Sequence, residues 1–225
     1  MKVNPQLNDV QTEIEEVRAY FDRVASTYED NPWYLAQGNS VRRFVTKATT
    51  GSVLDIGCGT GWLLRQILQD RPGWMGTGVD LSPLMVETAR RKAVADKILD
   101  LEFIEGNWET SPFTKTGFST ALCVSTFHYF ADPQTSARKV HDALAPGGQF
   151  LLMDRELEGA FLNKIWDTMH KWCIKDHCRF YRSSFLIQLL TEAGFSNVKI
   201  AARIKKYFWK GKLQTNLVLL SGTAS

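Results

Sequence analysis

Apolar side chains recur at intervals of three and four residues near the start of the chain, a spacing that lines one face of an α-helix. The positions are Val10, Ile14, Val17, Phe21 and Val24. This spacing predicts a helix over residues 10–28. Asn31-Pro32 and the Gly38-Asn39-Ser40 turn then break the pattern, and we expect a second helix over residues 39–48.

Short apolar runs alternate with helical segments in the middle of the chain. The runs predict strands at residues 53–56, 74–79, 101–105, 120–124 and 149–153. Helices are expected between them, one ending at Ile67, one opening at Ser82-Pro83 with serine as the N-cap, and one over residues 133–144. Alternating strands and helices favour a parallel sheet with helices on both faces, the doubly wound α/β class.

The C-terminal part of the chain has a different pattern. A helix is expected over residues 183–193, ended by Gly194 as a C-cap. Two strand-like runs follow at 197–208 and 213–220, joined by the short turn at 210–212. So short a turn predicts an antiparallel hairpin. We therefore expect a Rossmann-like, mostly parallel, seven-stranded sheet that ends in an antiparallel hairpin.

Composition and charge limit the possible functions. The chain has 225 residues and a formal net charge of +3, which is too small a bias to indicate a nucleic-acid partner. The four cysteines lack the spacing of a disulfide framework, which favours a reducing cytoplasm. We expect no signal peptide, because residues 1–16 are polar, and no integral membrane segment, because no apolar run is long enough.

The strongest chemical signal is the run Val53-Leu54-Asp55-Ile56-Gly57-Cys58-Gly59-Thr60-Gly61. A strand ends near an acidic residue, and a Gly-x-Gly-x-Gly turn then opens a helix. Glycines let the backbone turn tightly and approach a ligand, and a helix N-terminus offers unpaired N–H groups. Asp80 ends the next strand, where a carboxylate can accept both hydroxyls of a ribose. Asp55 either fixes the loop through its N–H groups or also contacts the cofactor through water.

These motifs resemble those of the class I S-adenosylmethionine-dependent methyltransferases, over about residues 10–220. Residues 53–61, 78–82, 103–108 and 144–148 are similar to four family motifs in the right order. Residues 21–28 are similar to the "FD-x-x-A-x-x-Y" opening of the small-molecule, quinone C-methyltransferase-like branch. The chain departs from the family at Asn107, where members usually have aspartate; an amide still offers an acceptor and a donor.

The resemblance implies S-adenosyl-L-methionine as cofactor and a small-molecule methyl acceptor, in a single domain of residues 1–225. Its parts are an N-terminal helical lid (1–48), a cofactor-binding core (52–154), a substrate cap (155–182) and a C-terminal helix and hairpin (183–225). The expected cofactor-binding residues are Tyr20, Tyr28, Asp55, Gly57, Gly59, Gly61, Asp80, Leu81, Asn107, Trp108 and Val124. The expected substrate-binding residues are Trp33, Tyr34, Phe127, Trp166, His170 and Tyr181.

His128 is the candidate catalytic residue, because it follows the fourth strand, at the edge where parallel sheets bind ligands. Its imidazole can take the acceptor's proton; the alternative is a structural histidine among aromatic side chains. His170, Cys173 and His177 share one helical face, but seven residues of helix rise about 10 Å, too far for one ion. We therefore expect no metal.

Other functions stay open at this point. A nicotinamide-dependent Rossmann oxidoreductase would carry Gly-x-Gly-x-x-Gly and lack the hairpin. A methyltransferase-like scaffold or regulatory subunit without activity would retain the same motifs. A methyltransferase acting on macromolecules usually carries an added recognition domain or an Asn/Asp-Pro-Pro-Tyr run, which this chain lacks. The basic and aromatic run at 203–210 is explained by charges that alternate outward on a hairpin strand.

Overall fold

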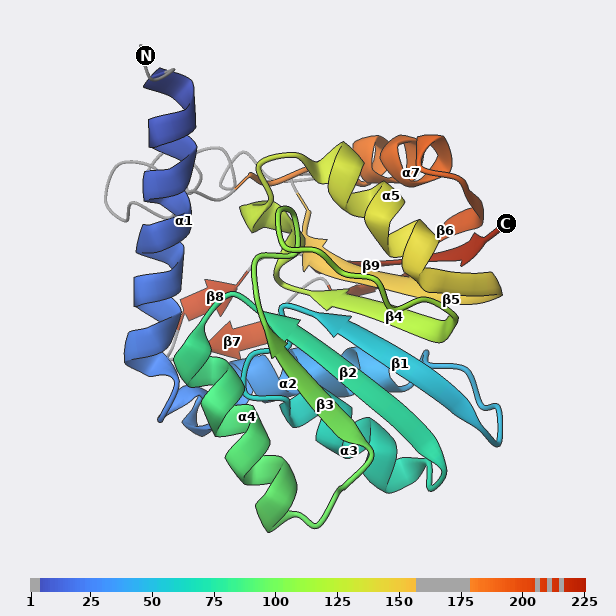
Figure 1. Cartoon of the computed structure of the whole chain (residues 1–225). Coiled ribbons are helices and arrows are strands. Elements are labelled where there is room, and N and C mark those ends of the chain that lie inside the picture. The colour runs from blue at the N-terminus through green and yellow to red at the C-terminus, as the bar shows by residue number, and fades with distance from the viewer. Residues whose placement is uncertain (1–4, 157–178, 205–206, 210–211, 215–216) are drawn as a thin grey trace.

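A computed structural model of the chain describes residues 5–156, 179–204, 207–209, 212–214 and 217–225. Seven strands form one sheet in the order β3-β2-β1-β4-β5-β9-β6 (Figure 1). These strands are β1 (Gly51–Ile56), β2 (Trp74–Asp80), β3 (Leu101–Glu105), β4 (Phe118–Val124), β5 (Leu144–Arg155), β6 (Phe195–Ile204) and β9 (Leu217–Ala224). The first five pair in parallel, and β9 pairs antiparallel with both β5 and β6. The predicted fold class is confirmed.

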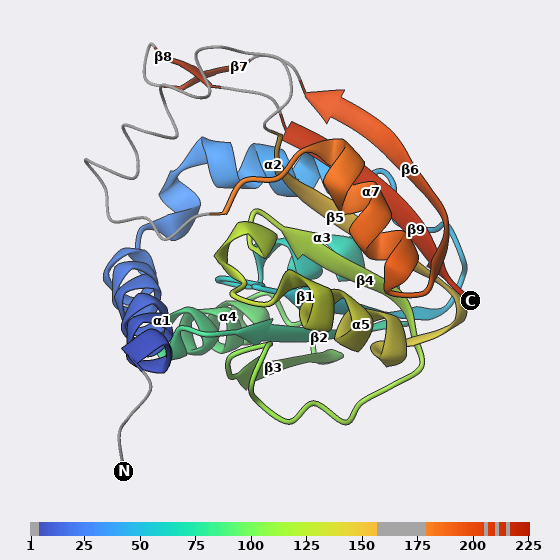
Figure 2. The ribbon, with the colours of Figure 1, turned by 90° about the horizontal axis from the view of Figure 1, so that it is seen from above.

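Helices cover both faces of this sheet, as Figure 2 shows from above. The described helices are α1 (Pro5–Val24), α2 (Pro32–Arg42), α3 (Trp62–Asp70), α4 (Pro83–Ala95), α5 (Pro133–Ala143) and α7 (Ser183–Glu192), with the 3-10 turns η1 (Tyr28–Asp30) and η2 (Phe127–Tyr129). One buried cluster joins the sheet to α2, α3 and α4, and a second joins it to α5 and α7. Because both faces are covered, β1 is a short apolar run with four successive buried residues.

Capping residues explain where several helices begin. The Ser82 hydroxyl accepts a hydrogen bond from the backbone N–H of Met85, and Pro83 occupies the first turn of α4. This confirms the predicted start. Asn31 caps α2 in the same way, by accepting from the N–H of Trp33. The prediction of a helix over 39–48 was therefore wrong, because Asn31-Pro32 starts the helix instead of interrupting it.

The first helix is shorter at its C-terminal end than predicted. α1 ends at Val24, and Tyr28 opens the separate turn η1. Ser26 and Thr27 follow the helix, and residues of this kind hydrogen-bond to nearby backbone in place of the helical ladder. The N–H of Thr27 indeed donates to the Val24 carbonyl at 3.1 Å.

The C-terminal strands form an antiparallel hairpin, as predicted. β6 is described to Ile204 and β9 from Leu217. Further along the hairpin, β7 (Tyr207–Trp209) pairs with β8 (Lys212–Gln214). The two pairings keep one register, because Ile204 lies opposite Leu217 and Tyr207 lies opposite Gln214. In the described part of the chain, every helix is too short or too polar to cross a membrane.

Candidate cofactor and acceptor site

Acidic side chains gather where the parallel strands end. Asp80 is the last residue of β2 and pairs in register with Glu105 of β3, while Asp55 lies next to the end of β1. Asp154 lies next to the end of β5. The carboxyl edge of an open parallel sheet is where such folds bind ligands.

The glycine-rich turn is fixed against the second strand. The N–H groups of Gly57 and Cys58 both donate to the Val79 carbonyl, at 2.8 and 3.1 Å. Gly57 has a φ of +73°, and a Cβ there would lie 2.2 Å from the Thr126 hydroxyl oxygen. Gly61, with a φ of +69°, caps α3 and would bring a Cβ within 2.6 Å of Phe103. Only glycine fits these two positions without rearrangement.

Asp80 joins this turn to α4. One carboxylate oxygen accepts from the N–H of Gly59 at 2.7 Å and the other from the N–H of Ser82 at 2.9 Å. Burial raises the pKa of Asp80 to about 6, although these two hydrogen bonds oppose the shift. Burial and the nearby charge of Asp80 raise the pKa of Asp55 to about 7. Neither carboxylate has a cationic partner among the described residues.

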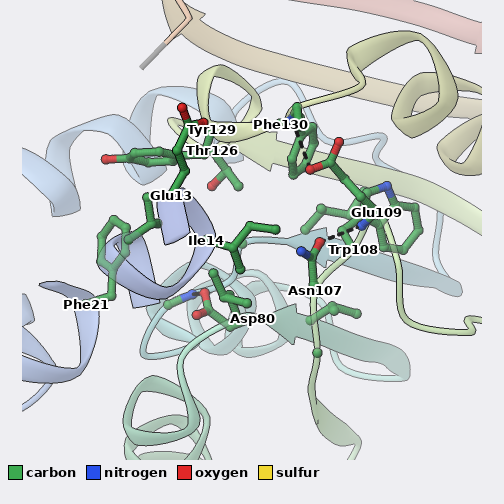
Figure 3. A pocket seen from close by; sticks show the side chains of 18 of the residues that line it. Glu13, Ile14, Phe21, Asp80, Asn107, Trp108, Glu109, Thr126, Tyr129 and Phe130 are labelled. Carbon is green, nitrogen blue, oxygen red and sulfur yellow. Dashed lines mark hydrogen bonds between the residues drawn. The ribbon is translucent and has the colours of Figure 1, made fainter. Parts of the chain in front are cut away.

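A cavity of about 860 Å³ lies between α1, the ends of β1 to β3 and the loop after β4 (Figure 3). Its lining includes seven expected cofactor-binding residues, namely Tyr28, Gly57, Gly59, Asp80, Leu81, Asn107 and Trp108. The helix α1 adds Ile14, Val17 and Phe21, which side-chain spacing placed on one face of the first helix.

A second cavity of about 500 Å³ lies on the other side of Tyr28, beneath α2. Tyr28, Gly57 and Ser125 line both cavities. Asp55, Val124 and Tyr34 line only the second. Expected cofactor-binding residues therefore line both cavities, and the expected substrate-binding residue Tyr34 lines the second.

Tyr28 is held at this boundary by aromatic and ionic contacts. Its ring stacks on Tyr34 with centroids 4.1 Å apart and planes at 7°. The neighbouring Glu29 accepts from the Thr60 hydroxyl at 2.6 Å and pairs with Arg65 at 2.7 Å. These contacts connect η1 to the glycine-rich turn and to α3.

Tyr20 does not share the face of Tyr28, contrary to the sequence prediction. It is 41% exposed and lines neither cavity, whereas Phe21 lines the larger one. The prediction assumed one continuous helix, but α1 ends at Val24, before Tyr28. A helix turns about 100° per residue, so Phe21 faces the cavity and Tyr20 faces away.

Asn107 and Trp108 are held firmly in the loop after β3. The Asn107 side-chain oxygen accepts from the N–H of Glu109 at 2.8 Å. The buried indole of Trp108 donates to the Ser136 carbonyl at 3.3 Å. Lys139 lies over that indole, 4.8 Å from the ring centroid, and donates to two carbonyls of the same loop.

His128 is buried in η2 and is oriented by Asp154. Its Nδ1 lies 2.7 Å from one carboxylate oxygen, and its backbone N–H donates to the other at 3.0 Å. The ring lies between Tyr129 and Phe180, with centroid distances of 4.1 and 5.5 Å. The carboxylate holds the tautomer with a proton on Nδ1, which leaves Nε2 as the basic nitrogen. His128 lines neither of the two cavities described above.

Three expected acceptor-binding residues lie in other surroundings. Trp33 packs against the core cluster of α2 and α3, Phe127 is fully buried, and Tyr181 stacks on Phe185. None of them lines either cavity. Trp166 and His170 fall outside the described residues, as do Cys173, His177 and most of the expected cap.

Some lining residues were missed by the sequence reasoning. Gln37 of α2 is 3% exposed and accepts a hydrogen bond from Ser125 at the boundary between the cavities. Ser125 has a φ of +53°, which is uncommon for a residue with a Cβ. The position of Ser125 just after β4 could have identified it from the sequence. No such indication exists for Gln37, because no helix was expected between residues 28 and 39.

Known proteins share parts of this sequence and fold. The chain is 31% identical over 142 residues to the demethylmenaquinone methyltransferase of Chlorobaculum tepidum, covering 59% of this chain and 56% of that protein. It is 32% identical over 121 residues to the malonyl-[acyl-carrier protein] O-methyltransferase of Halalkalibacterium halodurans, covering 52% and 44%. The chain thus spans about half the length of these curated relatives.

A solved structure from Thermotoga maritima, described as an S-adenosylmethionine-dependent methyltransferase and possible histamine N-methyltransferase, has the same fold. The TM-score is 0.69 at 21% identity, over 92% of this chain and 99% of the other. A family model described as a methyltransferase domain matches residues 30–200. That range contains the glycine-rich turn, Asp80, Asn107 and His128, and the chain therefore belongs to this methyltransferase-domain family.

Proposed function

We propose that the chain transfers the methyl group of S-adenosyl-L-methionine to a small, apolar or aromatic molecule. The observation that carries the proposal is the charge of the two cavities. Their described lining includes the acidic residues Glu13, Glu29, Asp55, Asp80 and Glu109, and no lysine, arginine or histidine. Glu13 and Glu29 pair with cations behind the lining, whereas Asp55, Asp80 and Glu109 have no cationic partner among the described residues. S-adenosylmethionine carries a sulfonium, an ammonium and a carboxylate group and is a net cation, whereas the pyrophosphate of a nicotinamide dinucleotide carries two negative charges. The lining therefore suits the sulfonium cofactor.

The cofactor-binding residues have distinct roles in this proposal. Asp80 accepts the ribose hydroxyls, Asn107 and Trp108 border the base, and the glycine-rich turn admits the sulfur end because no side chain intervenes. Tyr28 lies at the boundary between the cavities, where the methyl group would meet its acceptor. The sulfonium supplies an activated leaving group, so the protein's main task is to align the acceptor with it.

His128 is proposed as the base that removes the acceptor's proton. The contact of Asp154 with Nδ1 leaves Nε2 as the ring atom that would take this proton.

The acceptor class follows from the side chains around the second cavity. Tyr28, Tyr34, Trp62 and Leu63 present rings and apolar groups. The two relatives named above act, by their names, on a quinone ring and on an acyl-carrier-bound malonyl group. The aromatic lining favours an apolar or aromatic acceptor over a polyanionic one. We also propose that the protein works in the cytoplasm and without nucleic acid.

Calorimetric titration with S-adenosylhomocysteine and, separately, with NAD tests the proposal. We expect saturable binding of the first and none of the second. Binding of NAD and not of S-adenosylhomocysteine would indicate a nicotinamide-dependent oxidoreductase instead. Binding of neither would favour a scaffold or regulatory subunit.

Cofactor affinity is expected to rise with pH. The pKa of Asp55 is raised to about 7 in the empty protein, and a cation bound nearby favours the ionised carboxylate and lowers that pKa. Binding therefore releases a proton, and affinity should increase roughly tenfold between pH 5.5 and 7.5, then level off. Titrations in buffers of different ionisation enthalpy measure the released proton.

Asp55→Asn should flatten this pH dependence. It should also raise the thermal midpoint of the empty protein at pH 8 more than at pH 5.5. A carboxyl group whose pKa is raised by folding destabilises the folded state increasingly as the pH rises from its unfolded-state pKa, about 4, to its folded-state pKa, and the amide removes this cost. An affinity that stays constant with pH in the unmodified protein would contradict the assignment of Asp55.

Helix α1 is proposed as a lid over the larger cavity. Its polar contacts with the described core include Asp22, which accepts from the Ser82 hydroxyl at 2.5 Å, and Glu13, which pairs with Arg179 at 2.9 Å. Figure 1 shows the helix standing beside the sheet. We expect amide exchange in residues 10–35 to slow when S-adenosylhomocysteine binds. Equal protection with and without the ligand would count against a lid.

A further inference from the structure

Asn107 presents a hydrogen-bond donor to the larger cavity. A backbone N–H can pair only with an acceptor, so the 2.8 Å contact from the N–H of Glu109 fixes which end of the amide is oxygen. The amide nitrogen consequently points the other way, across the cavity toward Ile14 (Figure 3). The group that a ligand meets at this position is an NH₂.

The surrounding loop keeps this orientation. The backbone carbonyl of Asn107 accepts a hydrogen bond from the backbone N–H of Ser111 at 2.8 Å. The Glu109 carboxylate accepts from the N–H groups of Ala131 and Asp132 at 3.0 and 2.6 Å, which ties the loop after β3 to the loop after η2. Rotating the amide would place two donors against each other, so the donor stays directed at the ligand.

The polarity of Asn107 bears on which purine base the site accepts. Adenine offers an acceptor at N1 and a donor at its 6-amino group, whereas a 6-oxopurine offers an acceptor at O6 and a donor at N1. An aspartate in this place would accept from the 6-amino group and repel O6. The NH₂ of Asn107 instead finds an acceptor on either base, N1 of adenine or O6 of the oxopurine.

We propose that Asn107 reads an acceptor on the base, so that the site does not select the 6-amino group and also binds the 6-oxopurine form of the cofactor. This inference rests on the proposed function, because it assigns the base of a purine nucleoside cofactor to the Asn107 end of the cavity. It makes Asn107 the residue that sets specificity for the base.

The experiment compares two neutral ligands that differ only at the base: S-adenosylhomocysteine and its 6-oxo counterpart, S-inosylhomocysteine. Calorimetry gives both dissociation constants for the unmodified protein, Asn107→Asp and Asn31→Asp. The last adds the same charge at a residue that lines neither cavity. The carboxylate that Asn107→Asp introduces can still accept from the N–H of Glu109, and thermal midpoints check folding. Because the ligands carry equal charge, the ratio of their constants cancels any general effect of charge.

We expect the two constants of the unmodified protein to lie within tenfold of each other. Asn107→Asp should widen the ratio at least tenfold in favour of adenine, and Asn31→Asp should leave it unchanged. A wild-type ratio above tenfold overturns the inference without any variant, as does a smaller widening in Asn107→Asp. If either result is found and S-adenosylhomocysteine still binds the unmodified protein, only the inference on Asn107 fails and the proposed function stands. If S-adenosylhomocysteine does not bind, both the inference and the proposed function fail.

Discussion

Replacing Asp80 with alanine is expected to weaken binding of S-adenosylhomocysteine at least tenfold. The carboxylate is 9% exposed and is already positioned by the N–H groups of Gly59 and Ser82. In the proposed complex it accepts two ribose hydroxyls, and a hydrogen bond to a charged group contributes about 1.5–3 kcal/mol. Calorimetric titration at pH 7.5, above the pKa of about 6, measures the loss.

Asp142→Ala is the matched control, because the Asp142 side chain is 80% exposed and lines neither cavity. Its affinity should equal that of the unmodified protein. A thermal melt of Asp80→Ala separates a lost ligand contact from a lost fold. A folded Asp80→Ala protein that binds the ligand unchanged would refute the ribose assignment.

Replacing His128 with alanine is expected to lower the rate of methyl transfer by about 10²–10⁴-fold, the usual contribution of a general base. Binding of S-adenosylhomocysteine should stay within about threefold, because His128 lines neither described cavity. Asp154→Asn should lower the rate as well, since an amide no longer favours the tautomer with a basic Nε2. Single-turnover rates across pH 5.5–9 measure both effects.

His141→Ala is the control for removing an imidazole. His141 lies on α5 against Phe195 and lines neither described cavity. It should leave both the rate and the pH profile unchanged. A loss smaller than tenfold in His128→Ala, with an unchanged pH profile, would mean that His128 only positions its neighbours.

The arrangement around the glycine-rich turn was predictable because its motifs are local. The glycine-rich turn and Asp80 lie at the ends of adjacent strands, and each strand end can be read from the chain by itself. Parallel pairing of β1 with β2 then brings Asp80 within hydrogen-bond distance of Gly59. The parallel topology brings these residues together, because it places the carboxyl ends of all the parallel strands at one edge of the sheet.

The acceptor end was harder to predict because it depends on contacts between distant segments. Asp154 acts on His128 only because β4 and β5 are neighbours, and 26 residues separate the two in sequence. Tyr20 was misplaced by a single residue, which on a helix is a rotation of about 100°. Trp33 was expected at the acceptor site, but the cap at Asn31 starts α2 early and packs that ring against the core.

The hairpin was predictable because its two strands are close in sequence, but the strand beside it was not. An apolar or alternating run predicts an extended chain but not its partner, and β9 pairs with β5 as well as with β6. The sequence therefore indicated two antiparallel strands and could not indicate that β9 lies between β5 and β6.

Transfer of a labelled methyl group tests the central claim most directly. The unmodified protein and Asp80→Ala are each incubated with methyl-labelled S-adenosylmethionine and a cell extract that contains both metabolites and macromolecules. Products are then separated into a solvent-extractable small-molecule fraction and a macromolecular fraction. We expect label in the small-molecule fraction with the unmodified protein, and a rate at least tenfold lower with Asp80→Ala at limiting cofactor. Label confined to nucleic acid or protein, or a protein that binds the cofactor and labels nothing, would contradict the account.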